Sequence, residues 1–142
     1  MDIIRRNTDY ALRAVLILAQ QYQSGHLPAA TIARRQHVSV HLTSKLLQRL
    51  QQAGIVRSQM GAAGGFRLAR DPSQISVLDV VEAIQGRLTL NRCLIARHLC
   101  PLNPDCPLWP VLARIEQILR DGLGNIRISE LCLPVRGQTD EQ

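Results

Sequence analysis

The stretch that decides the fold covers residues 29–70 and reads AATIARRQHVSVHLTSKLLQRLQQAGIVRSQMGAAGGFRLAR. A short helical pattern at 29–38 is followed by a tight link and by a second, longer helical pattern, which Gly54 ends. A short helix, a turn and a second helix with a polar outer face form the helix-turn-helix pattern. The apolar residues expected to face inward are Ala30, Ile32 and Ala33 in the first helix and Leu42, Leu46, Leu47 and Leu50 in the second.

The residues after Gly54 predict a β-hairpin. Two strand-like runs, IVRSQ at 55–59 and FRLAR at 66–70, flank the glycine-rich segment MGAAGG. This segment lacks the Lys-Ser/Thr pair of a nucleotide-binding loop, so its glycines indicate a hairpin tip. A helix-turn-helix followed directly by such a hairpin is a winged helix.

Helical patterns also flank this stretch. A run that starts with the capping residues Asn7 and Thr8 is apolar on nearly every face, which predicts a buried helix over roughly residues 8–23. Ser76 with Asp79 resembles a capping box at the start of VLDVVEAIQ, a helix that a glycine ends. Both helices are expected to pack with the winged helix.

A near-heptad stripe of apolar residues follows Pro107 and predicts a helix of about four turns. The stripe has two interpretations. It packs back onto its own domain, or it pairs with a second copy, because winged helices usually read DNA as two-fold dimers. The stripe consists of Leu108, Val111, Leu112, Ile115, Ile118 and Leu119.

Positive charge is concentrated in the first half of the chain. Residues 1–70 carry ten Lys and Arg against two Asp, a net charge of +8, whereas the remainder carries seven Lys and Arg against nine acids. This asymmetry suggests a polyanion-binding part joined to a part with another task, although a generally solvated basic surface is the alternative. Only four aromatic residues occur, which disfavours base stacking on single strands and favours duplex DNA.

Nine side chains are candidates for DNA contact. Lys45 and Arg49 lie one helical turn apart and are expected to meet phosphates or guanine edges. Ser39 also stands where a helix-capping residue is expected, and some of the others are merely solvated. The candidates are Ser39, His41, Thr43, Ser44, Lys45, Gln48 and Arg49 in the second helix, and Arg57 and Arg67 in the hairpin.

Together these patterns predict a mainly α protein with a winged helix-turn-helix DNA-binding domain and a long C-terminal dimerisation helix. The domain covers residues 1–86, and a cysteine-containing loop covers 87–107. The dimerisation helix and a terminal turn cover 108–133, and a tail covers 134–142. We identify no signal peptide or membrane span, so we expect a cytoplasmic protein with reduced thiols.

Three of the four cysteines lie close together in NRCLIARHLCPLNPDCPLWP, residues 91–110. Clustered thiols in a reducing compartment indicate a metal or cluster site or a redox switch more often than a static disulfide. Zinc is the main competing metal, but its usual paired C-x2-4-C knuckles are absent. Cys132, further along, is expected to be a packed apolar residue, and His98 a solvated loop residue or a substitute ligand.

The chain resembles the Rrf-two (Rrf2) family of bacterial transcription regulators over roughly residues 3–133. The resemblance rests on GAAGGFRLAR, on ISVLDVVEAIQG and on the cysteine triplet in the expected place. It implies a homodimeric winged-helix repressor whose affinity for double-stranded DNA, at an inverted-repeat operator, is set by an iron–sulfur cluster. The cluster would sense nitric oxide, iron or redox state.

The resemblance also implies a set of ligands. Cys93, Cys100 and Cys106 match the family's three thiolates. The histidine that completes a [2Fe–2S] cluster in some relatives is replaced by Trp109, whereas Asp9 matches the aspartate that completes a [4Fe–4S] cluster in others. A [4Fe–4S] cluster with Asp9 from the second subunit is therefore favoured over [2Fe–2S]. Met60 departs from the family's usual wing-tip arginine, which puts minor-groove reading by the wing in question.

Two other functions compete with the cluster-controlled repressor. One is a cluster-free repressor that senses redox state through a reversible disulfide, and the other is a zinc-stabilised winged helix that binds protein. The basic first half and the polar second helix argue against the zinc-stabilised module. No arrangement of nucleophile and base, paired carboxylates or phosphate loop is present in the sequence, so we do not expect an enzyme.

Overall fold

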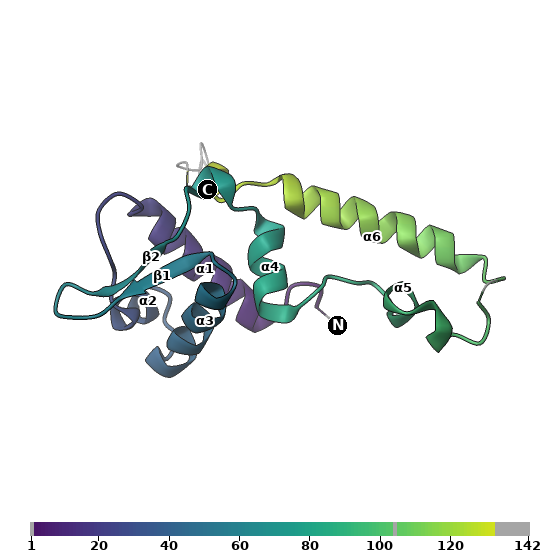
Figure 1. The fold of residues 1–142 in the computed structure, drawn as a ribbon, viewed down its shortest axis with the longest axis horizontal. Helices are drawn as coiled ribbons and strands as arrows, with labels where there is room; N and C mark the ends of the chain where they lie inside the picture. Colours follow the sequence, from purple (N-terminus) through teal and green to yellow (C-terminus); the bar gives the residue numbers. More distant parts are fainter. Residues whose placement is uncertain (1, 104, 133–142) are drawn as a thin grey trace, which may run out of the picture.

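The computed structural model describes residues 2–103 and 105–132, and the expected tail at 134–142 lies outside them. Figure 1 shows a winged helix from which one long helix extends. The elements are α1 (Arg6–Gln20), α2 (Ala29–Arg35), α3 (Val40–Gln52), β1 (Val56–Gln59), β2 (Gly65–Leu68), η1 (Pro72–Gln74), α4 (Val77–Gln85), α5 (Arg92–Ile95), η2 (Arg97–Leu99), α6 (Leu108–Asn125) and α7 (Ile128–Leu131). The mainly α winged helix-turn-helix fold is confirmed.

The helix-turn-helix forms as predicted, although its first helix ends at Arg35, three residues before the predicted end at 38. The Ser39 hydroxyl accepts a hydrogen bond from the Leu42 amide at 3.2 Å and caps α3, and Gly54 follows the helix at φ +73°. Leu46, Leu47 and Leu50 are buried in the core as predicted. The prediction that Ala30 faces inward is wrong: Ala30 is exposed, because the buried side of the short helix α2 is formed by its next turn, at Ile32 and Ala33.

The first helix begins and ends earlier than the predicted 8–23. It starts after Arg5, which provides no side-chain cap, so Asn7 and Thr8 lie inside the helix instead of capping it. The Thr8 hydroxyl is buried and donates to Gln85 Oε1 of α4 at 2.7 Å. A tertiary hydrogen bond therefore replaces the local cap that the sequence predicted.

The glycine pair at the end of the wing tip brings three chain segments together. β1 and β2 pair antiparallel, and Leu27 exchanges backbone hydrogen bonds with Phe66 on the other side of β2. At Gly65 the φ angle is +138°, and a Cβ there would lie 2.3 Å from the Leu27 carbonyl oxygen. A Cβ at Gly64 would lie 2.2 Å from the Gln59 carbonyl oxygen. Only glycine fits at positions 64 and 65.

Replacing Gly65 with alanine is expected to destabilise the protein by roughly 2 kcal/mol or more, since the left-handed conformation and the backbone collision both oppose a side chain. Urea unfolding followed by circular dichroism measures the change. The control is Gly122→Ala in α6, where a Cβ meets nothing within 4 Å and helix propensity favours alanine. Equal stabilities for the Gly65 variant and the wild type would contradict the close approach of Leu27.

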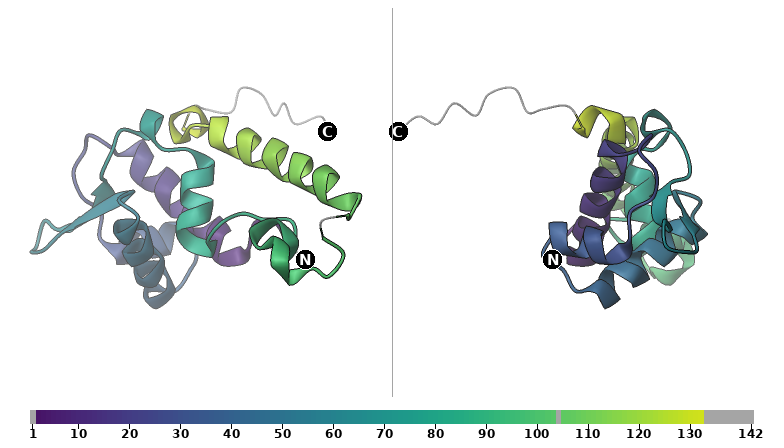
Figure 2. Two further views of the ribbon diagram at one scale, coloured as in Figure 1. Left: turned by 45° about the vertical axis from the view of Figure 1, so that its right-hand side comes forward. Right: turned by 90° about the vertical axis from the view of Figure 1, so that its left-hand side faces the viewer.

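The chain leaves the winged helix and then returns to it. From α4 it runs out through α5 and η2, reverses, and comes back along α6. At the end of α6 the Val77 amide donates to the Ile126 carbonyl at 3.0 Å, and the buried Ile128 of α7 joins the core. Figure 2 shows α7 beside α1 and η1. Both ends of the segment 86–127 are therefore attached to the winged helix.

Candidate DNA-binding surface and cysteine segment

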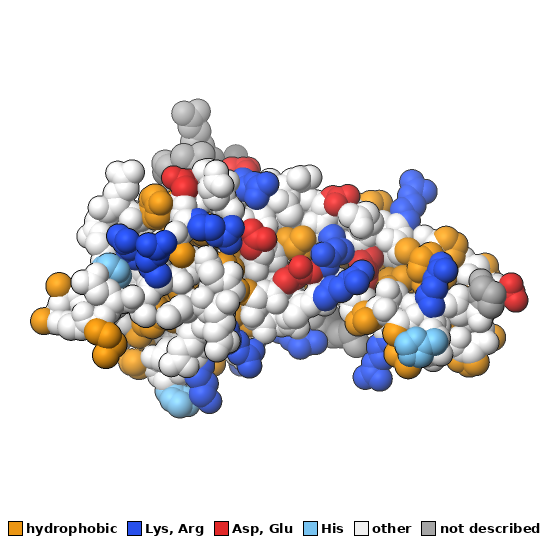
Figure 3. All heavy atoms as spheres, viewed as in Figure 1, with side chains coloured by type: hydrophobic (Ala, Val, Ile, Leu, Met, Phe, Trp, Pro, Cys, Tyr) orange, Lys and Arg blue, Asp and Glu red, His pale blue; other side chains and the backbone are white. Residues whose placement is uncertain are grey.

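The outer face of α3 carries a row of exposed polar side chains. His41, Lys45 and Gln48 are exposed and follow one another at one-turn intervals, and Ser44 beside them is half-buried. Basic side chains are spread over the winged-helix part of the surface (Figure 3). This face has the donors, the charge and the helical presentation that reading a major groove requires.

Two of the predicted DNA contacts on α3 are hydrogen-bonded to residues of other segments. The prediction for Thr43 is wrong: the residue is 0% exposed, and its hydroxyl accepts a hydrogen bond from Gln36 Nε2 at 3.4 Å, which joins α3 to the residue that follows α2. Arg49 Nη1 donates to the Ile84 carbonyl at 3.1 Å, so this arginine links α3 to α4.

A basic hollow beside α3 was not predicted. Arg5, Arg6 and Arg49 line a cavity of about 310 Å³ together with Gln85 at the end of α4. The sequence signal was available, since two adjacent arginines, Arg5 and Arg6, stand at the start of the first helix. Their placement beside α3, the second or recognition helix of the helix-turn-helix, depends on tertiary structure and could not be predicted from the sequence pattern.

The wing carries two arginines on its strands and an apolar tip. Arg57 and Arg67 are partners in the strand register. Met60 at the tip is 94% exposed, and hydrophobic atoms cover the outer end of the hairpin in Figure 3. The tip therefore has no charged side chain that could enter a DNA groove.

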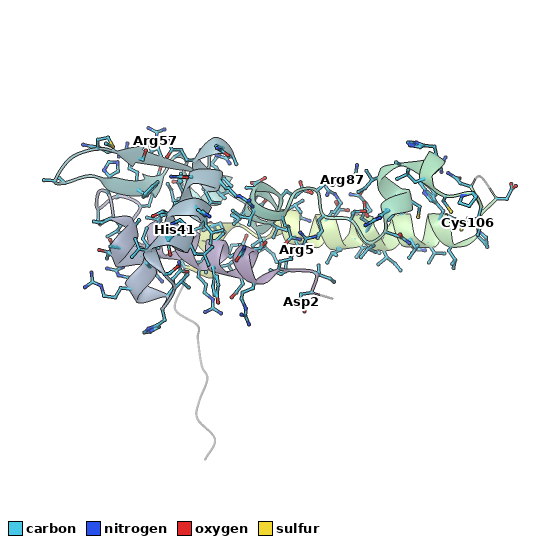
Figure 4. All side chains as sticks on the ribbon, turned by 90° about the horizontal axis from the view of Figure 1, so that it is seen from below. Asp2, Arg5, His41, Arg57, Arg87 and Cys106 are labelled. Atoms are coloured by element: carbon cyan, nitrogen blue, oxygen red, sulfur yellow. The ribbon has the colours of Figure 1, made fainter. Side chains whose placement is uncertain are left out.

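The cysteine segment lies at the far end of α6 from the recognition helix. Figure 4 shows Cys106 and His41 near opposite ends of the molecule. Cys93 lies in α5, Cys100 follows η2, and Cys106 comes two residues before α6. All three are partly exposed free thiols.

Trp109 fixes one end of this segment to α6. Its indole Nε1 donates to the Cys93 carbonyl at 3.2 Å, and the Arg97 guanidinium stacks 3.7 Å from the centre of its ring. Asn103 Nδ2 donates to the Arg97 carbonyl at 3.0 Å. Half-buried Trp109 therefore contacts the cysteine segment at Cys93 and Arg97.

The three thiols fit an iron–sulfur cluster by their chemistry, because cysteine thiolates are the usual ligands of such clusters. The structure does not gather them, however: across residues 2–103 and 105–132 no three His, Cys, Asp or Glu side chains form a metal-binding group. Asp9 lies in the first turn of α1 and pairs with Arg13 at 2.9 Å. His98 is exposed in η2. Within one chain, Asp9 and the cysteines are therefore not brought together.

Two carboxylates hold the connection between α4 and the cysteine segment. Glu116 of α6 is only 5% exposed, and it accepts hydrogen bonds from the Thr89 hydroxyl at 2.7 Å and the Leu90 amide at 2.9 Å. Glu82 of α4 accepts from the Leu88 amide at 3.0 Å and pairs with Arg120 of α6. We call residues 87–90, held by these two carboxylates, the linker clamp.

The last turn of α4 extends these contacts to the DNA-binding elements. Gln85 accepts hydrogen bonds from the Thr8 hydroxyl and the Arg5 amide and donates to the Ile3 carbonyl. The neighbouring Ile84 carbonyl accepts from Arg49 of α3. Hydrogen bonds therefore run from the linker clamp through α4 to α1 and to the recognition helix.

The charge of Glu116 is expected to stabilise the fold. Burial alone would raise its pKa, but the hydrogen bonds from Thr89 and Leu90 and the charge of Arg87 outweigh burial and hold the pKa below the ordinary glutamate value. A lowered pKa in the folded state means that this contribution is complete above the unfolded-state pKa and disappears as the pH falls through the folded-state pKa.

Replacing Glu116 with glutamine is therefore expected to cost about 1–3 kcal/mol at neutral pH. The difference from the wild type should shrink once the pH falls below about 4.3, the ordinary glutamate pKa. Denaturant unfolding between neutral and acidic pH measures it, and Asp121→Asn, an exposed change on the same helix, is the control. A constant difference at every pH would contradict the ionised network.

Cys132 stands apart from the other thiols. Its Sγ donates a hydrogen bond to the Ile128 carbonyl at 3.3 Å, and the side chain packs against the core. Burial raises the pKa of the Cys132 thiol. These contacts agree with the predicted role of a packed apolar residue.

No helix in the described residues is long and apolar enough to cross a bilayer.

Comparison with known proteins agrees with the sequence resemblance. The Rrf2 family model, described as an iron-dependent transcriptional regulator, matches residues 4–133. The transcriptional regulator IscR of Xenorhabdus nematophila is 31% identical over 122 residues, which are 86% of this chain and 74% of that protein. IscR of Cronobacter sakazakii is 32% identical, with 86% and 75% covered.

Solved structures share the fold along almost the whole chain. The IscR structure from T. potens has a TM-score of 0.70 at 26% identity and covers 90% of this chain and 84% of that one. The oxidized form of CymR from Staphylococcus aureus has a TM-score of 0.72 at 26% identity and covers 96% and 100%. CymR of B. subtilis, described as the global cysteine regulator, has a TM-score of 0.78 at 24% identity, covers 93% and 97%, and so shows the fold alone. These relatives are regulators and not enzymes, and the chain belongs to the Rrf2 family of transcriptional regulators.

Proposed function

We propose that this regulator is a homodimeric repressor whose affinity for DNA is controlled by an iron–sulfur cluster at Cys93, Cys100 and Cys106. One observation carries the proposal: the structure connects a segment with three free thiols to the recognition helix through the linker clamp and α4. A change in the thiol segment therefore has a hydrogen-bonded route to the DNA-reading surface.

The exposed apolar side chains of α6 support dimer formation. Leu108, Val111, Ile115 and Ile118 lie on this helix and are all largely exposed in the single chain. Their neighbours Leu112 and Leu119 are half-buried, so the stripe is divided between the chain's own packing and an uncovered face. An uncovered apolar face of this kind indicates a protein interface, and a second copy is the occupant that closes with two-fold symmetry.

The three cysteines and Asp9 of the second copy would hold the cluster. Trp109 occupies the position where histidine completes the [2Fe–2S] site in relatives, which supports a [4Fe–4S] cluster here. When bound, the cluster supplies iron that reacts with nitric oxide and oxidants. The residues of the chain position the site: Trp109 holds α5 against α6, and the linker clamp joins this assembly to α4.

The direct test is anaerobic reconstitution followed by absorption spectroscopy and DNA-shift assays with and without nitric oxide. We expect a coloured protein that contains iron and sulfide and binds an inverted-repeat operator until nitric oxide is added. A colourless protein with unchanged binding would overturn the cluster proposal. Stoichiometric zinc without salt-sensitive binding to duplex DNA would instead indicate the zinc-stabilised protein-binding module.

A second candidate is a repressor controlled by a disulfide. The observation that favours it is that the thiols are free, partly exposed and not gathered into a metal group in the described residues. One solved relative is the oxidized form of CymR from Staphylococcus aureus. Iron and sulfide analysis, together with thiol titration before and after oxidation, distinguishes the two mechanisms.

Replacing Lys45 with alanine is expected to weaken DNA binding about tenfold, because an exposed cation on the recognition helix is lost. If its partner is a phosphate, the slope of log K against log salt becomes shallower by about 0.9. Fluorescence anisotropy at several salt concentrations measures both effects. Arg114→Ala, which removes an exposed cation from α6, is the control and should change neither.

A further inference from the structure

We propose that the outer face of the wing contains a pocket for a phosphate group, formed by Arg57, Arg67 and the loop at 22–25. These residues line a cavity of about 570 Å³ between the end of α1 and the hairpin. The pocket is separate from the cysteine segment and from the outward row of α3.

The two arginines face each other across the hairpin. Arg57 of β1 and Arg67 of β2 are register partners in an antiparallel pair, so their side chains emerge on the same face. Side chains in this relation have their Cβ atoms about 5 Å apart, and like charges placed there repel each other. An anion bound between the two guanidinium groups would be attracted to both of them and would offset their mutual repulsion.

No acidic side chain among the described residues pairs with either arginine. Among the described residues the ion pairs are Arg13–Asp9, Arg87–Glu116 and Arg120–Glu82, none of which involves the wing. No acidic residue lines the cavity. Arg67 Nε is buried and has no hydrogen-bond partner in the described structure, whereas Arg57 Nη2 donates to the Ala69 carbonyl at 3.1 Å. A buried donor without a partner is costly, and a bound anion would satisfy it.

The backbone builds the remaining wall. The Leu27–Phe66 bridge and the close approach at Gly65 hold the loop against β2. This places Tyr22 and Gln23, with a phenol and an amide that can donate, at the rim beside Gly25. Leu68 and Ala69 of the hairpin complete the lining. The lining is therefore cationic and rich in donors.

Phosphate is the anion that this lining suits best. Guanidinium groups bind phosphate oxygens through paired N–H donors in a fixed fork, and two arginines match its multiple charge. The phosphate could belong to the DNA backbone or be a free phosphate. Binding of a DNA phosphate rests on the proposed function, whereas binding of free phosphate does not.

The experiment has two arms and uses the full chain. In the first arm, inorganic phosphate is titrated without DNA at constant ionic strength, and the melting temperature reports binding. In the second arm, duplex binding is measured at several salt concentrations. The wild type is compared with the Arg57→Gln/Arg67→Gln double variant and with Arg70→Gln, a nearby exposed arginine outside the pocket.

A pocket for free phosphate predicts that phosphate raises the melting temperature of the wild type and of Arg70→Gln, but not that of the double variant. A pocket for DNA phosphate predicts about a tenfold loss of duplex affinity and a salt slope shallower by about 0.9 in the double variant alone. If phosphate leaves all three melting temperatures unchanged and the double variant keeps the affinity and slope of Arg70→Gln, the pocket is overturned. Failure of the wild type to bind any duplex would refute the DNA-binding function, while the first arm would still decide the pocket.

Discussion

Replacing Cys100 with serine is expected to abolish cluster loading and, with it, the response of DNA binding to nitric oxide. Cys100 lies between the other two thiols in sequence and follows η2, so it is the central member of the proposed ligand set. Serine keeps the size of the side chain but removes the soft thiolate that iron requires. Iron and sulfide analysis after anaerobic reconstitution measures loading, and an operator shift assay with added nitric oxide measures the response.

Cys132 provides a matched control for this substitution. It is also a free, partly buried cysteine, but it packs against the winged-helix core near α1 and η1, away from the other three. Cys132→Ser should load iron and sulfide to the level of the wild type. If Cys100→Ser also loads normally, the cluster is not held by this triplet. If the wild type carries no iron but loses its DNA binding upon oxidation, and Cys100→Ser does not, the disulfide mechanism replaces the cluster.

Local rules predicted the parts of the fold that local interactions determine. Ser39 and the Ser76–Asp79 capping box form their hydrogen bonds within one turn, so the starts of α3 and α4 followed from the sequence. Thr8 is the counterexample, since its hydroxyl bonds to Gln85, 77 positions away along the chain. No nearby residue signals that contact, and the cap predicted at the start of α1 was therefore wrong.

In the candidate site, the exposed residues of α3 could be predicted from the sequence, whereas the buried polar residues could not. The spacing of His41, Lys45 and Gln48 already places them on one helical face, because each lies about one turn from the next. The burial of Thr43 depends on Gln36 from outside the helix, and sequence spacing does not contain that information. Glu116 was missed for the same reason: it stands next to an apolar stripe and would ordinarily be a solvated residue. Its partners lie 26 and 27 positions away.

Replacing Ile118 with glutamate is expected to convert the protein to a monomer and to remove most of its operator affinity. Ile118 is 62% exposed in the single chain, so the substitution costs the isolated chain little, and glutamate is a good helix former. In a dimer that buries this face, an unpaired carboxylate costs several kcal/mol for each of the two copies. The dimer dissociation constant should therefore rise at least about a thousandfold.

The neighbouring Gln117 tests whether the face, and not merely the added charge, is responsible. Gln117 is exposed and donates to Asp121 one turn along, so Gln117→Glu adds the same charge at a cost of only a few tenths of a kcal/mol from repulsion between like charges. Sedimentation equilibrium should show a dimer for Gln117→Glu and a monomer for Ile118→Glu. The monomer should bind half-site and full-site duplexes equally, because a two-fold operator rewards only a protein that presents two recognition helices. A dimeric Ile118→Glu variant would show that this face of α6 is not the interface, and the ligand expected from Asp9 of the second copy would then lose its structural basis.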